Sequence, residues 1–183
     1  MNPIDLSSFA GLTAMVLLTL NVVLGILISR NYNPARRWPQ RRIPLFRIHN
    51  WTAYTALAVV LLHPTLLLFA ERPHFRVFDI LLPVSSPGQT FYNSLGAMAF
   101  WCVLVVVITS YFRPRMGSRP WKKIHYTAYF AAAFLVAHGL LIDPDLKNRR
   151  PDLMDGEKVL VECCLLAVCV AGLWRLRQKR KMI

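Results

Sequence analysis

Five long apolar runs constrain this chain more than any other feature of its sequence. Four of them contain no Asp, Glu, Lys or Arg, and the fifth is interrupted only by Glu162; they cover residues 9–29, 48–70, 80–112, 124–142 and 159–174. A helix that crosses a bilayer needs roughly 20 predominantly apolar residues. The runs therefore predict an all-α integral membrane protein, built as a bundle of five transmembrane helices.

The third run is too long for one crossing and contains turn signals of its own. Pro83 and the sequence Ser-Ser-Pro-Gly at 85–88 favour a surface segment over residues 80–90, followed by a helix over 91–112. The other expected helices cover about 9–29, 48–70, 124–142 and 158–175, within a single domain of residues 1–183. Hydrophobic residues make up 55% of the chain, which excludes a disordered protein, because disordered chains are poor in apolar residues.

The net charge of +13 comes from basic residues that gather in three places: the connector after the first run, the connector after the third run, and the tail. The positive-inside rule assigns these places to the cytoplasm, so we expect the N-terminus outside and the C-terminus inside. We therefore expect the positive charge to set the membrane topology and to attract anionic lipid head groups, rather than to bind nucleic acid. The expected location of the protein is a bacterial inner membrane. The residues are Arg30, Arg36, Arg37, Arg41, Arg42, Arg47, Arg113, Arg115, Arg119, Lys122, Lys123, Arg175, Arg177, Lys179, Arg180 and Lys181.

The first run follows Met-Asn-Pro-Ile-Asp and lacks the positively charged start of a signal peptide, so we expect a retained helix. The chain contains neither a G-x-G-x-x-G turn after a strand nor a P-loop. We therefore expect no flavin or nicotinamide domain, and any such chemistry has to come from another chain.

Four of the five histidines lie in two of the expected helices. His49 and His125 each lie two residues after a basic residue at the inner boundary of their helix. His63 and His138 lie 14 and 13 residues further along, a rise of about 21 and 20 Å in a helix. Two helices thus present two histidine pairs at two depths, His49 with His125 (inner) and His63 with His138 (outer).

Ionisable residues inside a membrane are rare and are usually functional. Two neutral imidazoles that face each other in an apolar slot suit the axial positions of a six-coordinate haem b. The pattern therefore predicts two stacked haems. A proton relay or hydrogen bonds between helices are the alternatives. Helix geometry leaves one question open, because a step of 13 residues turns a straight helix roughly 140° away from its starting face. Either the helix over 124–142 contains a bend or π-bulge, or the haems approach it from different sides.

Two segments resemble the haem-binding helices of the ferric-reductase-like transmembrane domain family. One reads Arg-Ile-His-Asn-Trp at 47–51 and His-Pro at 63–64, and the other reads Trp-Lys-Lys-Ile-His-Tyr at 121–126 and His-Gly at 138–139. The family includes NADPH oxidases, ferric reductases and the haem-binding membrane subunit of the periplasmic methionine-sulfoxide reductase system. Its ligands are separated by thirteen residues on one helix and commonly by twelve on the other, as they are here. The resemblance covers about residues 9–175 and implies bis-histidine ligation by His49, His63, His125 and His138.

Haem propionates are anionic and need cationic partners. We expect Arg47, Lys122 and Lys123 to serve the inner haem, and Arg72 and Arg76 to serve the outer one. Two further residues have open roles. His74, in the outer connector, is either a solvated loop residue or a contact to an outer acceptor, a propionate or a metal. Glu162 is either a proton site, a propionate neighbour or a side chain that reaches the outer interface.

Together these features predict a dihaem cytochrome b that carries electrons from a cytosolic flavoprotein or quinol to an acceptor or partner enzyme at the outer face. It would act as the electron-transfer subunit of an oxidoreductase and would not itself oxidise NAD(P)H; a flavin or quinone from a partner, or shared with one, is a further expected cofactor. The alternative is a haem-bearing accessory subunit of a larger respiratory or photosynthetic complex, which stoichiometric partners would reveal on mild solubilisation.

A reporter fused to the C-terminus tests the expected topology. Because the basic tail should remain in the cytoplasm, a fluorescent protein fused there should be active and an alkaline phosphatase inactive. An active phosphatase would overturn the topology and exchange the inner and outer labels.

Overall fold

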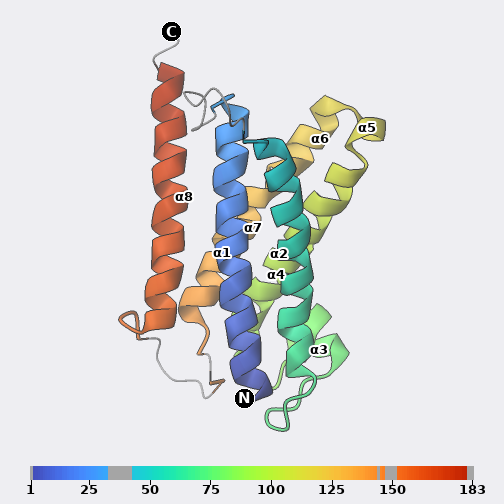
Figure 1. Cartoon of the computed structure of the whole chain (residues 1–183). Coiled ribbons are helices and arrows are strands. Elements are labelled where there is room, and N and C mark those ends of the chain that lie inside the picture. Colours follow the sequence, from blue (N-terminus) through green and yellow to red (C-terminus); the bar gives the residue numbers. More distant parts are fainter. Residues whose placement is uncertain (1, 33–42, 144, 147–151, 181–183) are drawn as a thin grey trace.

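The computed structural model describes residues 2–32, 43–143, 145–146 and 152–180, and within them the chain is helical with no strand. Two long helices come first, α1 (Pro3–Ser29) and α2 (Leu45–Leu67). Short elements, α3 (Val77–Leu81) and the 3₁₀ turn η1 (Pro83–Ser85), lead into α4 (Thr90–Tyr111). The rest of the chain forms α5 (Arg113–Met116), α6 (Ser118–His125), α7 (Thr127–Leu141) and α8 (Gly156–Arg180) (Figure 1).

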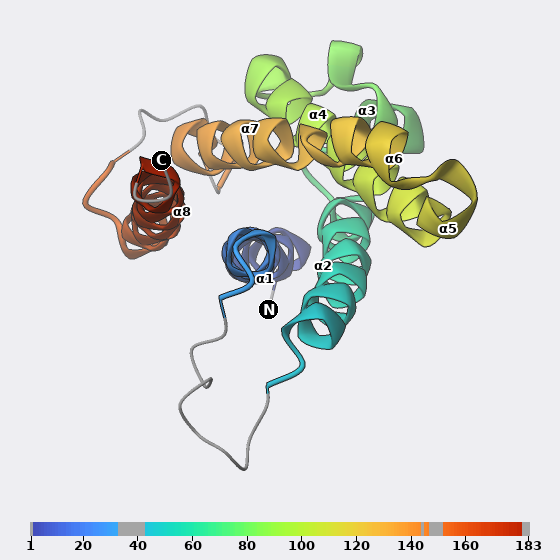
Figure 2. The same ribbon diagram turned by 90° about the horizontal axis from the view of Figure 1, so that it is seen from above.

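Helix α1 lies in the middle of the bundle, as the view along the helices shows (Figure 2). It packs along most of α2 on one side and against α8 on the other, while α4 packs against α7. The contact with α8 includes a small apolar cluster of Met15, Val161 and Cys164. The centre of the bundle therefore lies between α1 and α2 on one side and α4, α6 and α7 on the other.

Within the described residues, four helical segments are long and apolar enough to cross a membrane: α1, α4, the stretch formed by α6 and α7, and α8 up to Arg177. Helix α2 is also long, with 23 residues, but it contains the polar residues His49, Asn50 and His63 within its run. Helix α2 is not among the four segments above. The fifth crossing, by α2, therefore stays a prediction that rests on its charge-free run, residues 48–70, and its packing along α1 agrees with it.

The helix boundaries follow local sequence signals. Helix α1 begins at Pro3, earlier than the apolar run suggests, because Asn2 and Asp5 form a capping box. The Asn2 side chain accepts from Ile4 N at 3.2 Å, and Asp5 accepts from Asn2 N at 3.3 Å. As expected, residues 80–90 interrupt the third run, and α4 begins at Thr90.

The fourth apolar run contains a break that bears on the direction of its histidines. Helix α6 ends at His125 and α7 begins at Thr127. At the junction, the Tyr129 amide bonds to the Tyr126 carbonyl at 3.1 Å, a spacing of three residues rather than four. Helix geometry left two alternatives open: a bend or π-bulge in this helix, or haems that approach it from different sides. The structure shows that the helix is interrupted between its two histidines.

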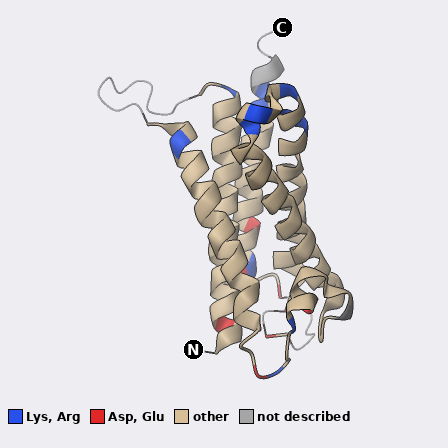
Figure 3. Cartoon of the chain, turned by 90° about the vertical axis from the view of Figure 1, so that its right-hand side faces the viewer, with Lys and Arg blue, Asp and Glu red and all other residues tan. Residues whose placement is uncertain are grey.

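Charges separate along the bundle axis (Figure 3). Lys and Arg gather at the end that carries α5 and α6, whereas Asp and Glu lie toward the opposite end, where α1 and α8 begin. This arrangement agrees with the charge asymmetry of the sequence. Several residues that entered that prediction lie outside the described residues: Arg36, Arg37, Arg41, Arg42 and Lys181.

Candidate functional site

Two pairs of histidines face each other across the centre of the bundle. The first pair is His49 of α2 and His125 of α6, whose ring centroids are 6.3 Å apart with planes at 66°. The second pair is His63 of α2 and His138 of α7, also 6.3 Å apart, with planes at 71°. The tertiary structure thus brings together the same two pairs that matching depths had suggested.

The separation within each pair fits one metal ion between two imidazoles. A metal–nitrogen bond is about 2.0 Å, and the ring centre lies roughly 1.1 Å behind the nitrogen, so two imidazoles on opposite sides of one metal ion have ring centres about 6.2 Å apart. Both observed centroid distances, 6.3 Å, are close to this value. Within the described part of the chain, no group of three or more His, Cys, Asp and Glu side chains gathers as a metal cluster. A two-imidazole donor set of this kind suits haem iron.

Hydrogen bonds to neighbouring helices orient three of the four rings. His63 Nδ1 lies 2.7 Å from the Ser7 carbonyl, and His49 Nδ1 lies 3.1 Å from the Asn21 carbonyl, both on α1. His138 Nδ1 lies 2.8 Å from the carbonyl of Tyr92 on α4. A carbonyl can only accept, so Nδ1 carries the proton in each ring. Nε2 then keeps the lone pair that a metal needs.

A glycine lies four residues after each of these three carbonyls and makes room for the ring. A Cβ added at Gly11 would lie 3.0 Å from the His63 ring, and one added at Gly96 would lie 3.0 Å from the His138 ring. At Gly25 the corresponding contact, to His49, is 3.4 Å. These glycines were not among the residues predicted from the sequence. The equal four-residue offset from Ser7, Asn21 and Tyr92 becomes visible only when the helices are paired.

His125 is held in a different way. Its Nδ1 lies 3.4 Å from the hydroxyl of Ser110 on α4, and that hydroxyl also accepts from Trp121 Nε1 at 3.2 Å. The Trp121 ring lies 4.7 Å from the His125 ring, tilted by 30°, and the Arg113 guanidinium lies 4.3 Å from the Trp121 centroid. A side-chain hydroxyl therefore replaces the backbone carbonyl at this ring.

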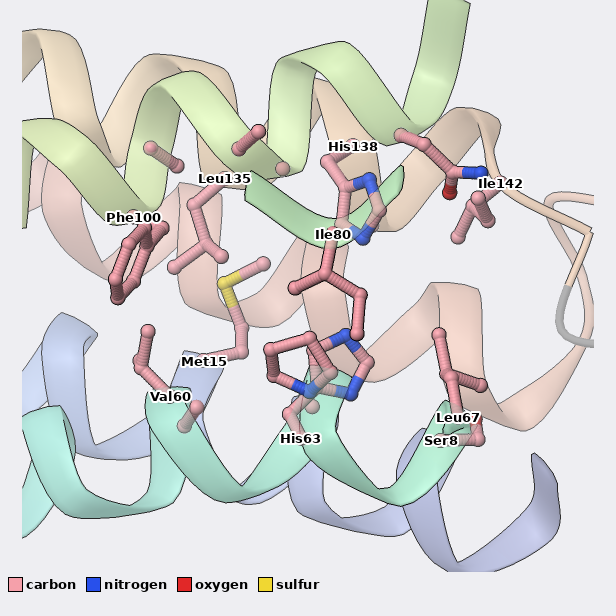
Figure 4. Close-up of a pocket in the computed structure, with 18 of the residues that line it drawn as sticks. Ser8, Met15, Val60, His63, Leu67, Ile80, Phe100, Leu135, His138 and Ile142 are labelled. Carbon is pink, nitrogen blue, oxygen red and sulfur yellow. The ribbon is translucent and has the colours of Figure 1, made fainter. Parts of the chain in front are cut away.

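A cavity surrounds each pair. The first cavity, around His49 and His125, has a volume of about 450 Å³ and includes Lys122 among its lining residues. The second cavity, around His63 and His138, has a volume of about 260 Å³ and a predominantly apolar lining (Figure 4). An aliphatic layer lines both cavities, so it lies between the two pairs; it consists of Leu18, Val103 and Leu135.

The cations around the two cavities differ in part from those expected. Lys122 lines the first cavity, and its propionate role stays a prediction; Arg113 and Arg175, expected only as basic residues of the inner face, line it too. The other four predicted propionate partners are exposed and are not among the lining residues of either cavity: Arg47, Lys123, Arg72 and Arg76. Their propionate roles stay predictions. His74 is exposed in the connector after α2, and Glu162 is half-buried on α8.

Comparison with known families gives one match. The family described as ferric reductase like transmembrane component matches residues 10–136. The matched range includes His49, His63 and His125 and ends two residues before His138. No curated protein and no solved structure matched the chain.

Substitution of Gly96 by Ala tests the close approach of α4 to the His138 ring. A Cβ at 3.0 Å from the ring forces a shift, and overpacking of this kind costs roughly 1–3 kcal/mol of stability. Thermal unfolding in detergent should therefore show a lower Tm for Gly96→Ala.

Gly172→Ala in α8 is the matched control, because nothing lies within 4 Å of its added Cβ. In a helix this change should be neutral or stabilising by up to about 1 kcal/mol. Equal Tm values for the two variants would contradict the packing argument.

Proposed function

The chain belongs to the ferric reductase like transmembrane component family, and we propose that it is a dihaem cytochrome b that carries electrons across the membrane. Members of this family generally bind haem. In the proposal, the first pair holds an inner haem and the second pair an outer one. One observation carries the proposal: the two imidazoles of each pair stand 6.3 Å apart, and the two pairs lie at two levels of the bundle.

The residues around the pairs fit this role. When bound, haem iron supplies reversible one-electron chemistry. The carbonyls of Ser7, Asn21 and Tyr92 hold three imidazoles in one tautomer and one orientation, so the ligating nitrogen is preorganised. The lining of the second cavity is predominantly apolar, as suits the body of a haem. Along α2, the 14 residues from His49 to His63 rise about 21 Å, a distance that spans most of the apolar layer.

The charge distribution supports an orientation of the bundle in the membrane. The end rich in Lys and Arg (Figure 3) is the end that the positive-inside rule assigns to the cytoplasm. We propose that electrons enter there, from a flavoprotein or quinol, and leave at the opposite end to an acceptor or partner enzyme. A basic entry surface would also steer a negatively charged donor. The proposed location is a bacterial inner membrane.

Haem analysis of purified protein tests the function. A pyridine haemochrome assay should give two b haems per chain. His63→Ala should remove the outer haem and leave the inner spectrum unchanged, since the first pair lies in a separate cavity. His74→Ala, which changes an exposed histidine, should retain both haems. A colourless wild-type protein would overturn the proposal, and an unchanged spectrum in His63→Ala would overturn the ligand assignment.

Ser110 offers a test of the inner site alone. Loss of the hydroxyl removes the partner of His125 Nδ1, and loss of such a partner typically costs about 10–100-fold in affinity. Ser110→Ala should therefore release the inner haem to apomyoglobin at least about tenfold faster, with the outer haem unaffected.

Ser94→Ala is the control for this experiment, because the Ser94 hydroxyl bonds only to the Thr90 carbonyl of its own helix, at 2.8 Å. Equal release of the inner haem from the two variants would show that Ser110 does not hold His125.

A further inference from the structure

The most deeply buried cation of the described chain lies beside the second pair. Lys158, in the first turn of α8, is 3% exposed and lines the second cavity. Its Nζ donates to the carbonyl of Gly139 at 2.8 Å and to the carbonyl of Ile142 at 2.5 Å. Ile142 and Ser8 lie at one end of this cavity, and Val60 and Phe100 at the other (Figure 4). The Lys158 ammonium therefore lies at the end of the cavity that is remote from the first pair.

The Lys158 ammonium has one N–H donor that the recorded hydrogen bonds do not use. An ammonium group has three N–H donors, and the two recorded hydrogen bonds use two of them. Both acceptors are neutral carbonyls, and no carboxylate oxygen accepts from Lys158 within the described residues. A buried charge is costly unless it is paired. The lining thus contains a cation with one free donor, on which the carboxylates of Glu157, Asp155 and Asp143 act through their charge rather than through a recorded hydrogen bond.

The two acids that line the same cavity have other donors. Glu157 accepts from the Ser8 hydroxyl at 3.2 and 3.3 Å, and Asp79 accepts from the Arg76 amide at 2.9 Å. Among the described residues of this lining, Lys158 is the sole Lys or Arg. An anion in the cavity would therefore find its hydrogen-bonding cation only at Lys158.

We propose that Lys158 is the cationic partner of a haem propionate in the second cavity, in place of the exposed Arg72 and Arg76. This inference rests on the proposed function, because it needs a haem between His63 and His138. A charge-assisted hydrogen bond from an ammonium to a carboxylate is roughly twice as strong as a neutral one. Helix α8 would then bind the cofactor in addition to packing against α1 and α7.

A purely structural role is the competing explanation, because Lys158 also ties α8 to the end of α7, next to His138. The test uses the full holoprotein and compares Lys158→Gln, which keeps N–H donors for the two carbonyls but removes the charge, with Lys158→Arg, which keeps the charge. Arg72→Gln and Arg76→Gln are controls. Two measurements are made: the propionate bending modes by resonance Raman, and the midpoint potential of the haem that His63→Ala removes.

Lys158→Gln should shift a propionate mode and lower the midpoint of the outer haem, because loss of a nearby cation disfavours reduction. We expect about a tenfold shift of the reduction equilibrium, equal to about 59 mV for one electron. Lys158→Arg should restore most of both signals, and the two arginine variants should match the wild type. Unchanged modes and midpoint in Lys158→Gln would overturn the inference, as would equal shifts in the Arg72 or Arg76 variants.

If Lys158→Gln fails to accumulate, Lys158→Arg and wild-type protein with ¹⁵N-labelled lysine decide the matter. A lysine band in the redox infrared difference spectrum that is present in the wild type and lost in Lys158→Arg supports the contact, and its absence from the wild type overturns it. A wild-type protein without haem would instead contradict the proposed function.

Discussion

The packing of the bundle depends on the hydrogen bonds that the histidine Nδ1 atoms make to neighbouring helices. Inside a bilayer, neighbouring lipid is as apolar as a helix, so close packing and hydrogen bonds decide which helices associate. Here three Nδ1 atoms bond to the backbone of an adjacent helix. Such a bond requires the ring to lie against bare backbone, and Gly11, Gly25 and Gly96 provide it. The pairing of α1 with α2 and of α4 with α7 follows from the same contacts.

The register between α1 and α2 follows from two equal spacings along these helices. The two histidines of α2 are 14 residues apart, and so are the α1 carbonyls that they contact, at Ser7 and Asn21. Two antiparallel helices with the same rise can therefore satisfy both rings at once. The α4 side lacks this match, because Tyr92 and Ser110 are 18 residues apart whereas their histidines are 13 apart. The break at Tyr126 and the Ser110 side chain, in place of a carbonyl, accommodate the difference.

Helix α8 has a separate place in the molecule. The family match ends at residue 136, before this helix begins. Nevertheless, α8 packs on α1 through Val161 and Cys164, and its first turn reaches the end of α7 through Lys158. In the proposed function this helix would complete the outer haem site. Its contribution is a charge, whereas α2, α6 and α7 contribute the imidazoles.

Much of the fold and of the candidate site could be predicted from the sequence, because few backbone structures can cross a bilayer. Charge-free runs predicted the helical class, and the similar steps of 14 and 13 residues between histidines predicted the two pairs. The count of five crossings and the orientation stay predictions. The sequence could not identify the glycines, Ser110 or Lys158, because their roles depend on which helices are neighbours. It also left the direction of His125 and His138 open, since only the packed chain shows where a helix is interrupted. One-dimensional spacing sets the depth of a residue in the membrane, but its partners come from lateral packing, which the tertiary structure alone decides.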